Sequence, residues 1–130
     1  MTTVALDCMG GDHGPREAVS GAAELSLSRQ DIRLILVGDA PEIAGILDSY
    51  SYDPAGITIQ HASQWVSQEE TPALAIKEKP EASILIACRA VAEGRADALV
   101  TAGSTGAAIL AADRCLGRIA GVRRAALARD

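Results

Sequence analysis

The sequence predicts an α/β protein in which helices cover a mostly parallel sheet. Composition is the first observation: 48% of the 130 residues are hydrophobic, but only 2% are aromatic and Phe is absent. Such a core consists of Val, Ile, Leu and Ala, as in parallel sheets covered by helices. The second observation is the alternation of strand-like and helix-like runs along the chain, which right-handed crossovers between parallel strands require.

The first half of the chain is expected to form alternating strands and helices. The run IRLILVG is nearly continuous in Ile, Leu and Val, so its strand should be buried on both faces. The helix after the first strand should begin at a proline, because the first helical turn tolerates proline. We expect strands at residues 2–7, 32–38 and 56–62, and helices beginning at Pro15 and at Asp39, the latter as N-cap.

The second half continues the same order after a polar stretch, residues 63–71, to which the pattern assigns no element. We expect helices at residues 72–79, 81–95 and 104–118, a strand at 96–102, and the start of another strand in GVRRAALA (121–128). The chain ends at Asp130 directly after this apolar run. We therefore expect residues 1–130 to be the N-terminal part of a single, truncated α/β domain.

Charge and cysteine content narrow the function classes. The formal net charge is −5, which argues against a general nucleic-acid binder. The C-terminal segment is nevertheless basic, and it is either a solvated face or a docking patch for an acidic partner. Its arginines are Arg114, Arg118, Arg123, Arg124 and Arg129, against Asp113 and Asp130. The three cysteines form no C-x-x-C pair, and the N-terminus has no basic region of a secretory signal, so we expect a cytoplasmic protein.

Two glycine-bearing loops follow strands at the same expected sheet edge, where ligands of parallel sheets bind. The first glycine loop is DCMGGDHGP (residues 7–15), and the second is TAGSTGA (101–107). Neither matches a dinucleotide fingerprint or a P-loop. In the second loop, free N–H groups at the helix start and the Ser and Thr hydroxyls favour binding of an anion. The alternative is purely structural: the Ser or Thr is an N-cap and the glycines form a tight corner. The candidate binding residues are Gly10, Gly11, Gly103, Ser104, Thr105 and Gly106; Asp12 and Ser104 are the candidate catalytic residues.

Other polar residues near this edge have a structural and a chemical interpretation. Asp7, Asp12 and His13 are either an acid–base pair or half a metal site, or simply turn residues. We expect no metal, because a third or fourth ligand is not evident. Cys8 lacks an identifiable base, and His61 fits a structural role. Lys77 and Lys79 are either surface charges or reach an anion at this edge.

Several motifs occurring in order resemble a known family. They are VALDCMGGDHGP (residues 4–15), LILVGD (34–39), AIKEKPEAS (75–83), VAEGRADALVTAGSTGAAI (91–109) and GRIAGVRRAALA (117–128). Together they resemble the bacterial phosphate acyltransferases of phospholipid synthesis, and the resemblance covers essentially the whole chain. Members of that family are more than twice as long, so it is their N-terminal portion that this chain resembles.

The resemblance implies a three-layer α/β/α, Rossmann-like fold akin to that of phosphotransacetylases. It also implies transfer of a fatty acyl group from acyl carrier protein to inorganic phosphate, giving acyl phosphate. A membrane glycerol-3-phosphate acyltransferase would use that product. The family implies a homodimer, cytoplasmic or peripherally membrane-associated, without a cofactor. Cys8 stands where the family usually has Ala, and Ser104 where it usually has Asn. Within this hypothesis we expect Gly106→Val to impair activity of the full-length protein without unfolding it.

Two other functions remain open from the residues. One is a non-catalytic anion- or ligand-binding module in which the glycine loops are only corners. The other is a phosphotransacetylase-like enzyme that uses coenzyme A thioesters.

Overall fold

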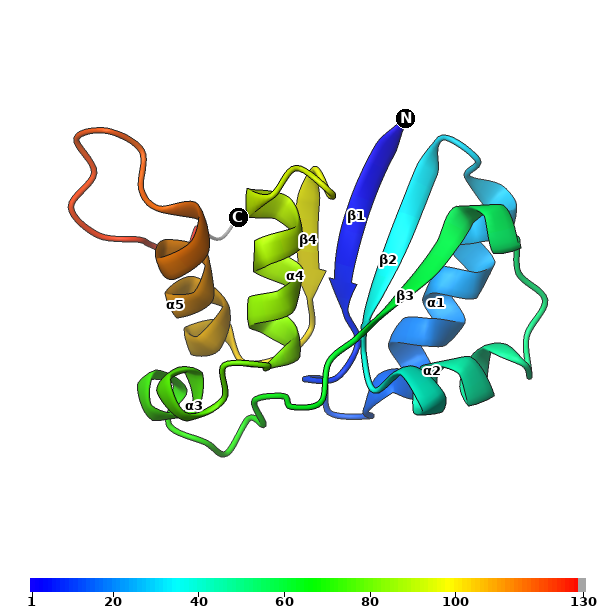
Figure 1. The fold of residues 1–130 in the computed structure, drawn as a ribbon, viewed down its shortest axis with the longest axis horizontal. Helices are drawn as coiled ribbons and strands as arrows, with labels where there is room; N and C mark the ends of the chain where they lie inside the picture. The colour runs from blue at the N-terminus through cyan, green and yellow to red at the C-terminus, as the bar shows by residue number, and fades with distance from the viewer. Residues whose placement is uncertain (129–130) are drawn as a thin grey trace.

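A computed structural model describes residues 1–128 and contains one parallel sheet with helices on both faces (Figure 1). The strands are β1 (Thr2–Asp7), β2 (Ile32–Gly38), β3 (Ile57–His61) and β4 (Ala98–Thr101), in the order β3-β2-β1-β4. The helices are α1 (Pro15–Ser28), α2 (Ala40–Leu47), α3 (Pro72–Glu78), α4 (Ser83–Ala92) and α5 (Thr105–Leu116). A 3-10 turn, Pro54–Gly56, precedes β3. The predicted fold class is thus confirmed.

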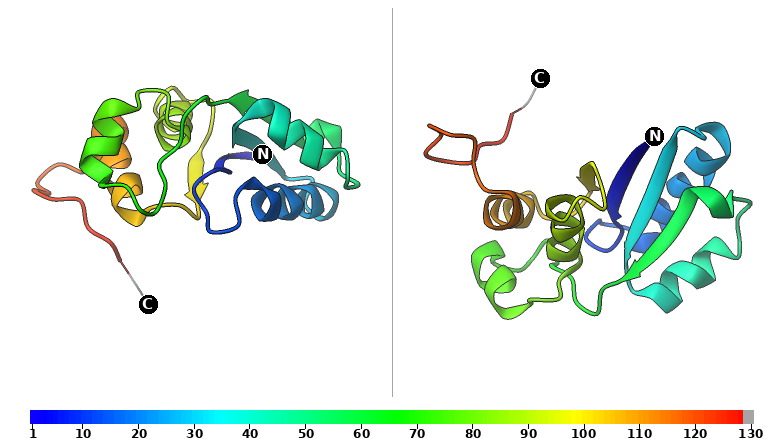
Figure 2. Two further views of the ribbon diagram at one scale, coloured as in Figure 1. Left: turned by 90° about the horizontal axis from the view of Figure 1, so that it is seen from below. Right: turned by 45° about the horizontal axis from the view of Figure 1, so that its top comes forward.

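The two faces of the sheet follow from the alternation of side chains along the strands. Leu6 is in register with Leu36 through β1 and β2, and this face packs under α1 and α2. Ala5 and Val37 belong to the cluster on the opposite face, where α4 covers the sheet. Figure 2 shows the sheet between these helical layers. A further cluster joins α3, α4 and α5 beyond the β4 edge.

The strand order reverses between β1 and β4. The chain moves from β1 outward to β3 on one side, and then crosses to β4 on the other side of β1. In open parallel sheets, ligands bind outside the carboxyl ends of the strands at such a switch point. Both glycine loops follow these two strands, so the topology places them together (Figure 1).

One local prediction was wrong. Residues 121–128 form no strand: no neighbouring strand pairs with them, Gly121 has a φ of 89°, and the Arg123 carbonyl instead accepts a hydrogen bond from Arg118. Asp39 is the N-cap residue of α2, as predicted, although its side chain makes no cap hydrogen bond. His61 replaces it, because its Nδ1 accepts from the Ala40 N–H at 3.1 Å, which gives His61 the structural role expected of it.

The remaining elements appear where the sequence predicts them, and their ends differ from the predicted bounds by at most three residues. None of the helices within residues 1–128 has the length and apolar character needed to cross a bilayer.

Candidate functional site

The two glycine loops touch each other through their backbones at the carboxyl edge of the sheet. A Cβ built on Gly10 would lie 2.7 Å from the Cα of Gly103, and one built on Gly103 would lie 3.0 Å from the Cα of Gly10. Real Cβ atoms essentially never lie 2.7 Å from a backbone atom, so the contact requires glycine at position 10, and a Cβ on Gly103 would fit only if the Gly10 backbone shifted. The structure therefore brings together loops 93 residues apart in the sequence.

A buried hydrogen-bond chain fixes the same junction. Asp7, at the end of β1, is 5% exposed and accepts from the Met9 N–H at 3.1 Å and from the Thr101 hydroxyl at 3.0 Å. The Thr101 oxygen in turn accepts from the Gly103 N–H at 3.0 Å. Because both carboxylate oxygens of Asp7 are engaged, Asp7 holds the loops in position rather than acting as a free acid or base.

The polar stretch left unassigned by the sequence, residues 63–71, crosses over the first glycine loop, and we call it the strap. Gln68 Nε2 donates to the Gly10 carbonyl at 3.4 Å. Lys79 anchors the strap by donating to the Trp65 carbonyl at 2.9 Å and to Glu70 Oε1 at 2.5 Å. Lys79 is thus committed to the strap and does not reach an anion at this edge. Sequence reasoning missed the strap because no periodic pattern marks it.

The start of α5 combines a cap with free donors. Ser104 Oγ accepts from the Ala107 N–H at 3.2 Å, which is the N-cap role considered from the sequence. The Ala108 N–H bonds to the Ser104 carbonyl. Among the described residues, no acceptor uses the N–H groups of Thr105 and Gly106, so the positive end of this helix keeps two donors available for an anion.

Gly106 has a packing role that the sequence did not reveal. A Cβ at this position would lie 2.8 Å from Pro72 Cγ, at the first turn of α3. Gly106→Val would therefore push α3 away from α5. The expectation that this variant leaves the fold intact is corrected, and the variant is no clean test of anion binding.

A pocket of about 380 Å³ lies between the ends of β1 and β4. Of the candidate residues it is lined by Gly11 and Asp12, with His13, Thr101 and Ala102 beside them. Ser104 and Gly106 do not line it, and Thr105 lines a separate hollow beside β4. The sequence-predicted residues therefore fall into two groups: Gly11 and Asp12 line the pocket, whereas Ser104, Thr105 and Gly106 lie at the start of α5.

Titration and ligand geometry limit what the pocket can do. Burial is the main cause, and the neighbouring Asp7 carboxylate the second, that raises the pKa of the Cys8 thiol to about 12. The thiol therefore stays protonated and is no nucleophile. His13 and Glu17 approach to 4.0 Å on the exposed side of the pocket. Within the part of the chain that the structure describes, no group of three or more His, Cys, Asp or Glu side chains could hold a metal ion.

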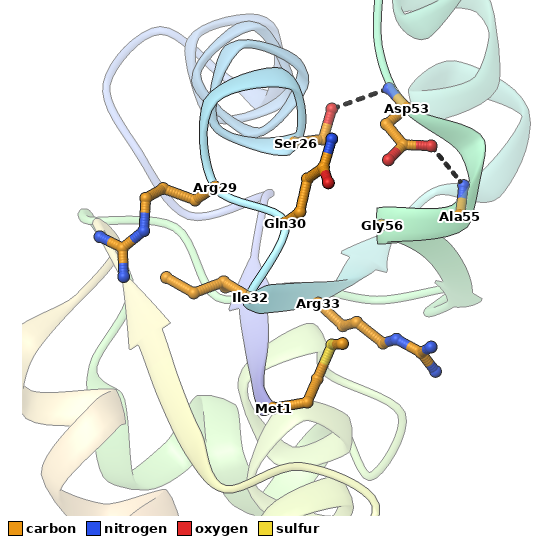
Figure 3. Close-up of a pocket in the computed structure, with 9 residues that line it drawn as sticks. All are labelled: Met1, Ser26, Arg29, Gln30, Ile32, Arg33, Asp53, Ala55 and Gly56. Carbon is orange, nitrogen blue, oxygen red and sulfur yellow. Dashed lines mark hydrogen bonds between the residues drawn. The ribbon is translucent and has the colours of Figure 1, made fainter.

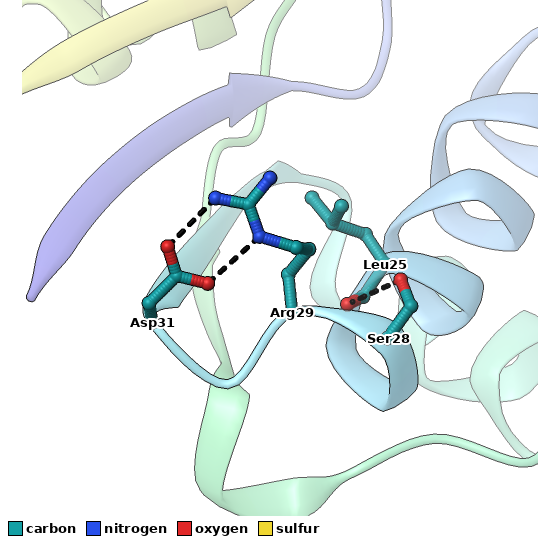
Figure 4. Close-up of polar contacts among 4 residues, drawn as sticks. All are labelled: Leu25, Ser28, Arg29 and Asp31. Atoms are coloured by element: carbon teal, nitrogen blue, oxygen red, sulfur yellow. Dashed lines mark hydrogen bonds and ion pairs between the residues drawn. The ribbon is translucent and has the colours of Figure 1, made fainter.

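A second hollow, of about 240 Å³, lies at the opposite, amino edge of the sheet (Figure 3). Ser26 accepts there from the Asp53 N–H, and Asp53 accepts from the Ala55 N–H, so these two side chains are engaged within the protein. Arg29 forms two hydrogen bonds with Asp31, at 2.8 and 2.7 Å, and these lower the pKa of Asp31 to about 2 (Figure 4). This hollow contains none of the sequence-predicted site residues.

The basic C-terminal segment is only partly available for a partner. Arg118 donates to both oxygens of Asp113, at 2.6 and 3.0 Å. Arg114 lines a shallow hollow between α3 and α5 together with Lys77, and Arg123 and Arg124 are exposed. Arg129 and Asp130 lie outside the described residues.

Comparison with known proteins agrees with this architecture. Residues 2–130 match the model of a family described as "Fatty acid synthesis protein". The chain is 43% identical over 121 residues to a phosphate acyltransferase of Syntrophomonas wolfei, covering 93% of this chain and 38% of that protein. It is 46% identical over 127 residues to a phosphate acyltransferase of Desulfitobacterium hafniense, covering 98% of this chain and 37% of that protein. The chain spans little more than a third of the length of these relatives. Because the match extends over nearly every residue, this chain belongs to the fatty acid synthesis protein family.

Proposed function

We propose that this chain forms part of an enzyme that transfers a fatty acyl group from acyl-[acyl-carrier-protein] to inorganic phosphate. The observation that carries the proposal is the backbone contact between the two glycine loops at the switch point of the sheet, beside a pocket and a helix start with free N–H groups. The names of the related proteins support the same reaction.

In this proposal a phosphate oxygen attacks the thioester carbonyl. A C–O bond forms, the C–S bond breaks, and the carrier thiolate takes up the proton that phosphate releases. Asp12 is the candidate base on the pocket wall, while Ser104 and the N–H groups of Thr105 and Gly106 hold phosphate. Positioning and stabilisation of the oxyanion would supply most of the acceleration.

The pocket itself offers no cationic side chain to hold phosphate. Its lining includes Asp7, Asp12 and Glu17 and, among the described residues, neither Lys nor Arg. In this proposal the anion is therefore held beside the pocket, at the start of α5, by N–H groups and hydroxyls, as at other helix starts. Gly10, Gly11, Gly103 and Gly106 would shape the walls of the crevice.

The proposal includes the partners of the reaction. Acyl carrier protein would dock on the exposed arginines near the C-terminal end, so its binding should weaken with salt. The complete enzyme would be a homodimer in the cytoplasm, peripheral to the membrane, and would pass acyl phosphate to a membrane glycerol-3-phosphate acyltransferase.

The test measures transfer of labelled inorganic phosphate into a lipid-extractable product. The 130-residue chain and a version extended to the length of its relatives are compared, each with a carrier-protein thioester and with a coenzyme A thioester. Thermal unfolding with and without phosphate is measured in parallel, since a bound anion raises stability by mass action.

Product from the carrier-protein thioester in the extended version supports the proposal. Product from the coenzyme A thioester alone would instead make it a phosphotransacetylase-like enzyme. Protection by phosphate without product from either donor would leave a binding module and overturn the proposed reaction.

A further inference from the structure

The strap lies against both glycine loops of the candidate site. In Figure 1 it runs along the carboxyl edge of the sheet, from the end of β3 to the start of α3. On the way Gln68 donates to the Gly10 carbonyl at 3.4 Å, and a Cβ on Gly10 would lie 3.7 Å from the Val66 carbonyl oxygen. Directly after the strap, Pro72 packs so closely on Gly106 that its Cγ lies 2.8 Å from where a Cβ would stand. The path of the strap therefore bears on the backbone of both loops.

One side chain, Lys79, ties the strap together. Its Nζ donates to the Trp65 carbonyl at 2.9 Å and to Glu70 Oε1 at 2.5 Å, at two points five residues apart in the strap. The other oxygen of Glu70 accepts from the Ser67 N–H at 2.8 Å. The side chains of Lys79 and Glu70 are only 28% and 33% exposed, so water and salt screen this pair less than a fully exposed one. We call this set of hydrogen bonds the strap anchor.

We propose that Lys79 is a positioning residue of the phosphate site, which it keeps in the binding form by holding the strap against both glycine loops. The inference rests on the proposed phosphate-dependent reaction and adds to it a residue that touches no substrate. The N–H groups assigned to phosphate belong to Thr105 and Gly106, and Gly106 is the residue on which Pro72 packs. Release of the strap frees Pro72 and the Gly10 peptide to move, so these donors lose their fixed positions. Phosphate then binds well only to the anchored form, and its apparent affinity falls with the fraction of anchored molecules.

The strap contains its own spectroscopic reporter. Trp65 is the only tryptophan of the chain, the residue is 37% exposed, and its carbonyl accepts one of the anchoring hydrogen bonds. Release of the strap should therefore increase the quenching of Trp65 fluorescence by acrylamide. Because phosphate favours the anchored form, it should close a released strap and lower the quenching again.

The experiment uses the 130-residue chain at constant ionic strength, with inorganic phosphate as the ligand and chloride as the control anion. Calorimetry measures the dissociation constant for phosphate, and acrylamide quenching of Trp65 is followed over the same titration. Lys79→Met removes the strap anchor, whereas Lys79→Arg keeps a cationic donor at that position. Lys77→Met is the matched control, because it removes the same charge two residues away, in α3, and leaves the strap anchor intact.

Lys79→Met should weaken phosphate binding about tenfold, which is about 1.4 kcal/mol and close to the contribution of one hydrogen bond to a charged group. Its Trp65 quenching should exceed that of the wild type without phosphate and return to the wild-type value at saturating phosphate. Lys79→Arg and Lys77→Met should both behave like the wild type. In the version extended to the length of the relatives, Lys79→Met should raise the KM for phosphate about tenfold and leave kcat near the wild-type value.

Equal phosphate affinity in Lys79→Met and Lys77→Met, or increased quenching that phosphate does not reverse, overturns the positioning role and leaves the strap a purely structural element. A wild type that binds no phosphate overturns it as well. Should Lys79→Met fail to fold, Glu70→Gln weakens the same anchor and should show the same pattern at smaller amplitude, and an unchanged affinity in that variant overturns the role. Phosphate-dependent closure of the strap in an extended protein without acyl transfer would refute the proposed reaction and leave the role of Lys79 standing.

Discussion

Replacing Thr101 by Val removes the hydroxyl that joins the two glycine loops while keeping the volume and β-branching of the side chain. In the native structure this hydroxyl donates to Asp7 Oδ2 and accepts from the Gly103 N–H, each at 3.0 Å. The variant leaves a carboxylate oxygen of Asp7, a residue only 5% exposed, without its side-chain donor. It also removes the side-chain link between the ends of β4 and β1, while their backbone pairing remains.

The expected loss follows from those two bonds. A hydrogen bond to a charged group contributes about 1.5–3 kcal/mol and a neutral one about 1 kcal/mol, and the methyl group of Val recovers part of the sum. We therefore expect the free energy of unfolding to fall by about 2–3 kcal/mol. With a urea m-value of about 2 kcal/mol/M, the midpoint should fall by about 1 M.

Urea unfolding followed by far-UV circular dichroism measures this change. Thr58→Val is the matched control, because the Thr58 hydroxyl makes only a long, 3.5 Å contact with the Leu34 carbonyl, and its midpoint should stay near that of the wild type. Thr101→Ser retains the hydroxyl and should recover most of the stability. A Thr101→Val midpoint equal to that of Thr58→Val would refute the role assigned to this chain of hydrogen bonds.

Three further predictions concern neighbouring parts of the edge. The Cys8 thiol, whose pKa burial raises to about 12, should resist iodoacetamide at pH 8 in the folded protein and react after denaturation, as mass spectrometry of the alkylated peptide will show. Hydrogen bonding from Lys79 lowers the pKa of Glu70 below its usual 4.5, so its contribution to stability is complete above about pH 5 and is lost as the pH falls through the lowered pKa. Glu70→Gln should accordingly flatten the dependence of the urea midpoint on pH between 3 and 5, and an unchanged slope would contradict the strap anchor. Gly10→Ala should lower the free energy of unfolding by more than about 2 kcal/mol, because its Cβ would meet the backbone of Gly103; a wild-type melting curve would argue against the contact.

Local patterns were sufficient to predict the elements of the sheet and its helices. The IRLILVG run forms β2 (Ile32–Gly38). Pro15 is the first residue of α1, as expected because the first helical turn tolerates proline. The parallel topology followed from the alternation of these elements. What these predictions share is that each depends on residues close together in the sequence.

The details of the site depend instead on residues far apart. Nothing near Gly10 in the sequence reveals its contact with Gly103, and nothing near Ala40 reveals that His61 caps its helix. The strap carries no periodic pattern because tertiary hydrogen bonds, such as that from Lys79 to the Trp65 carbonyl, determine its path. The strand predicted at residues 121–128 is absent for a related reason: a strand forms only where another strand pairs with it, and the local sequence does not reveal such a partner.

The glycines of the two loops now divide by their roles. Close packing requires Gly10 and Gly106, against the Gly103 backbone and against Pro72, so glycine content alone is no argument for an anion site. The proposed phosphate site depends instead on the free N–H groups at the start of α5 and on the pocket that Gly11 lines. Val100 lines both the pocket and the hollow that includes Thr105, so the pocket and the helix start would converge on the exposed end of one short strand.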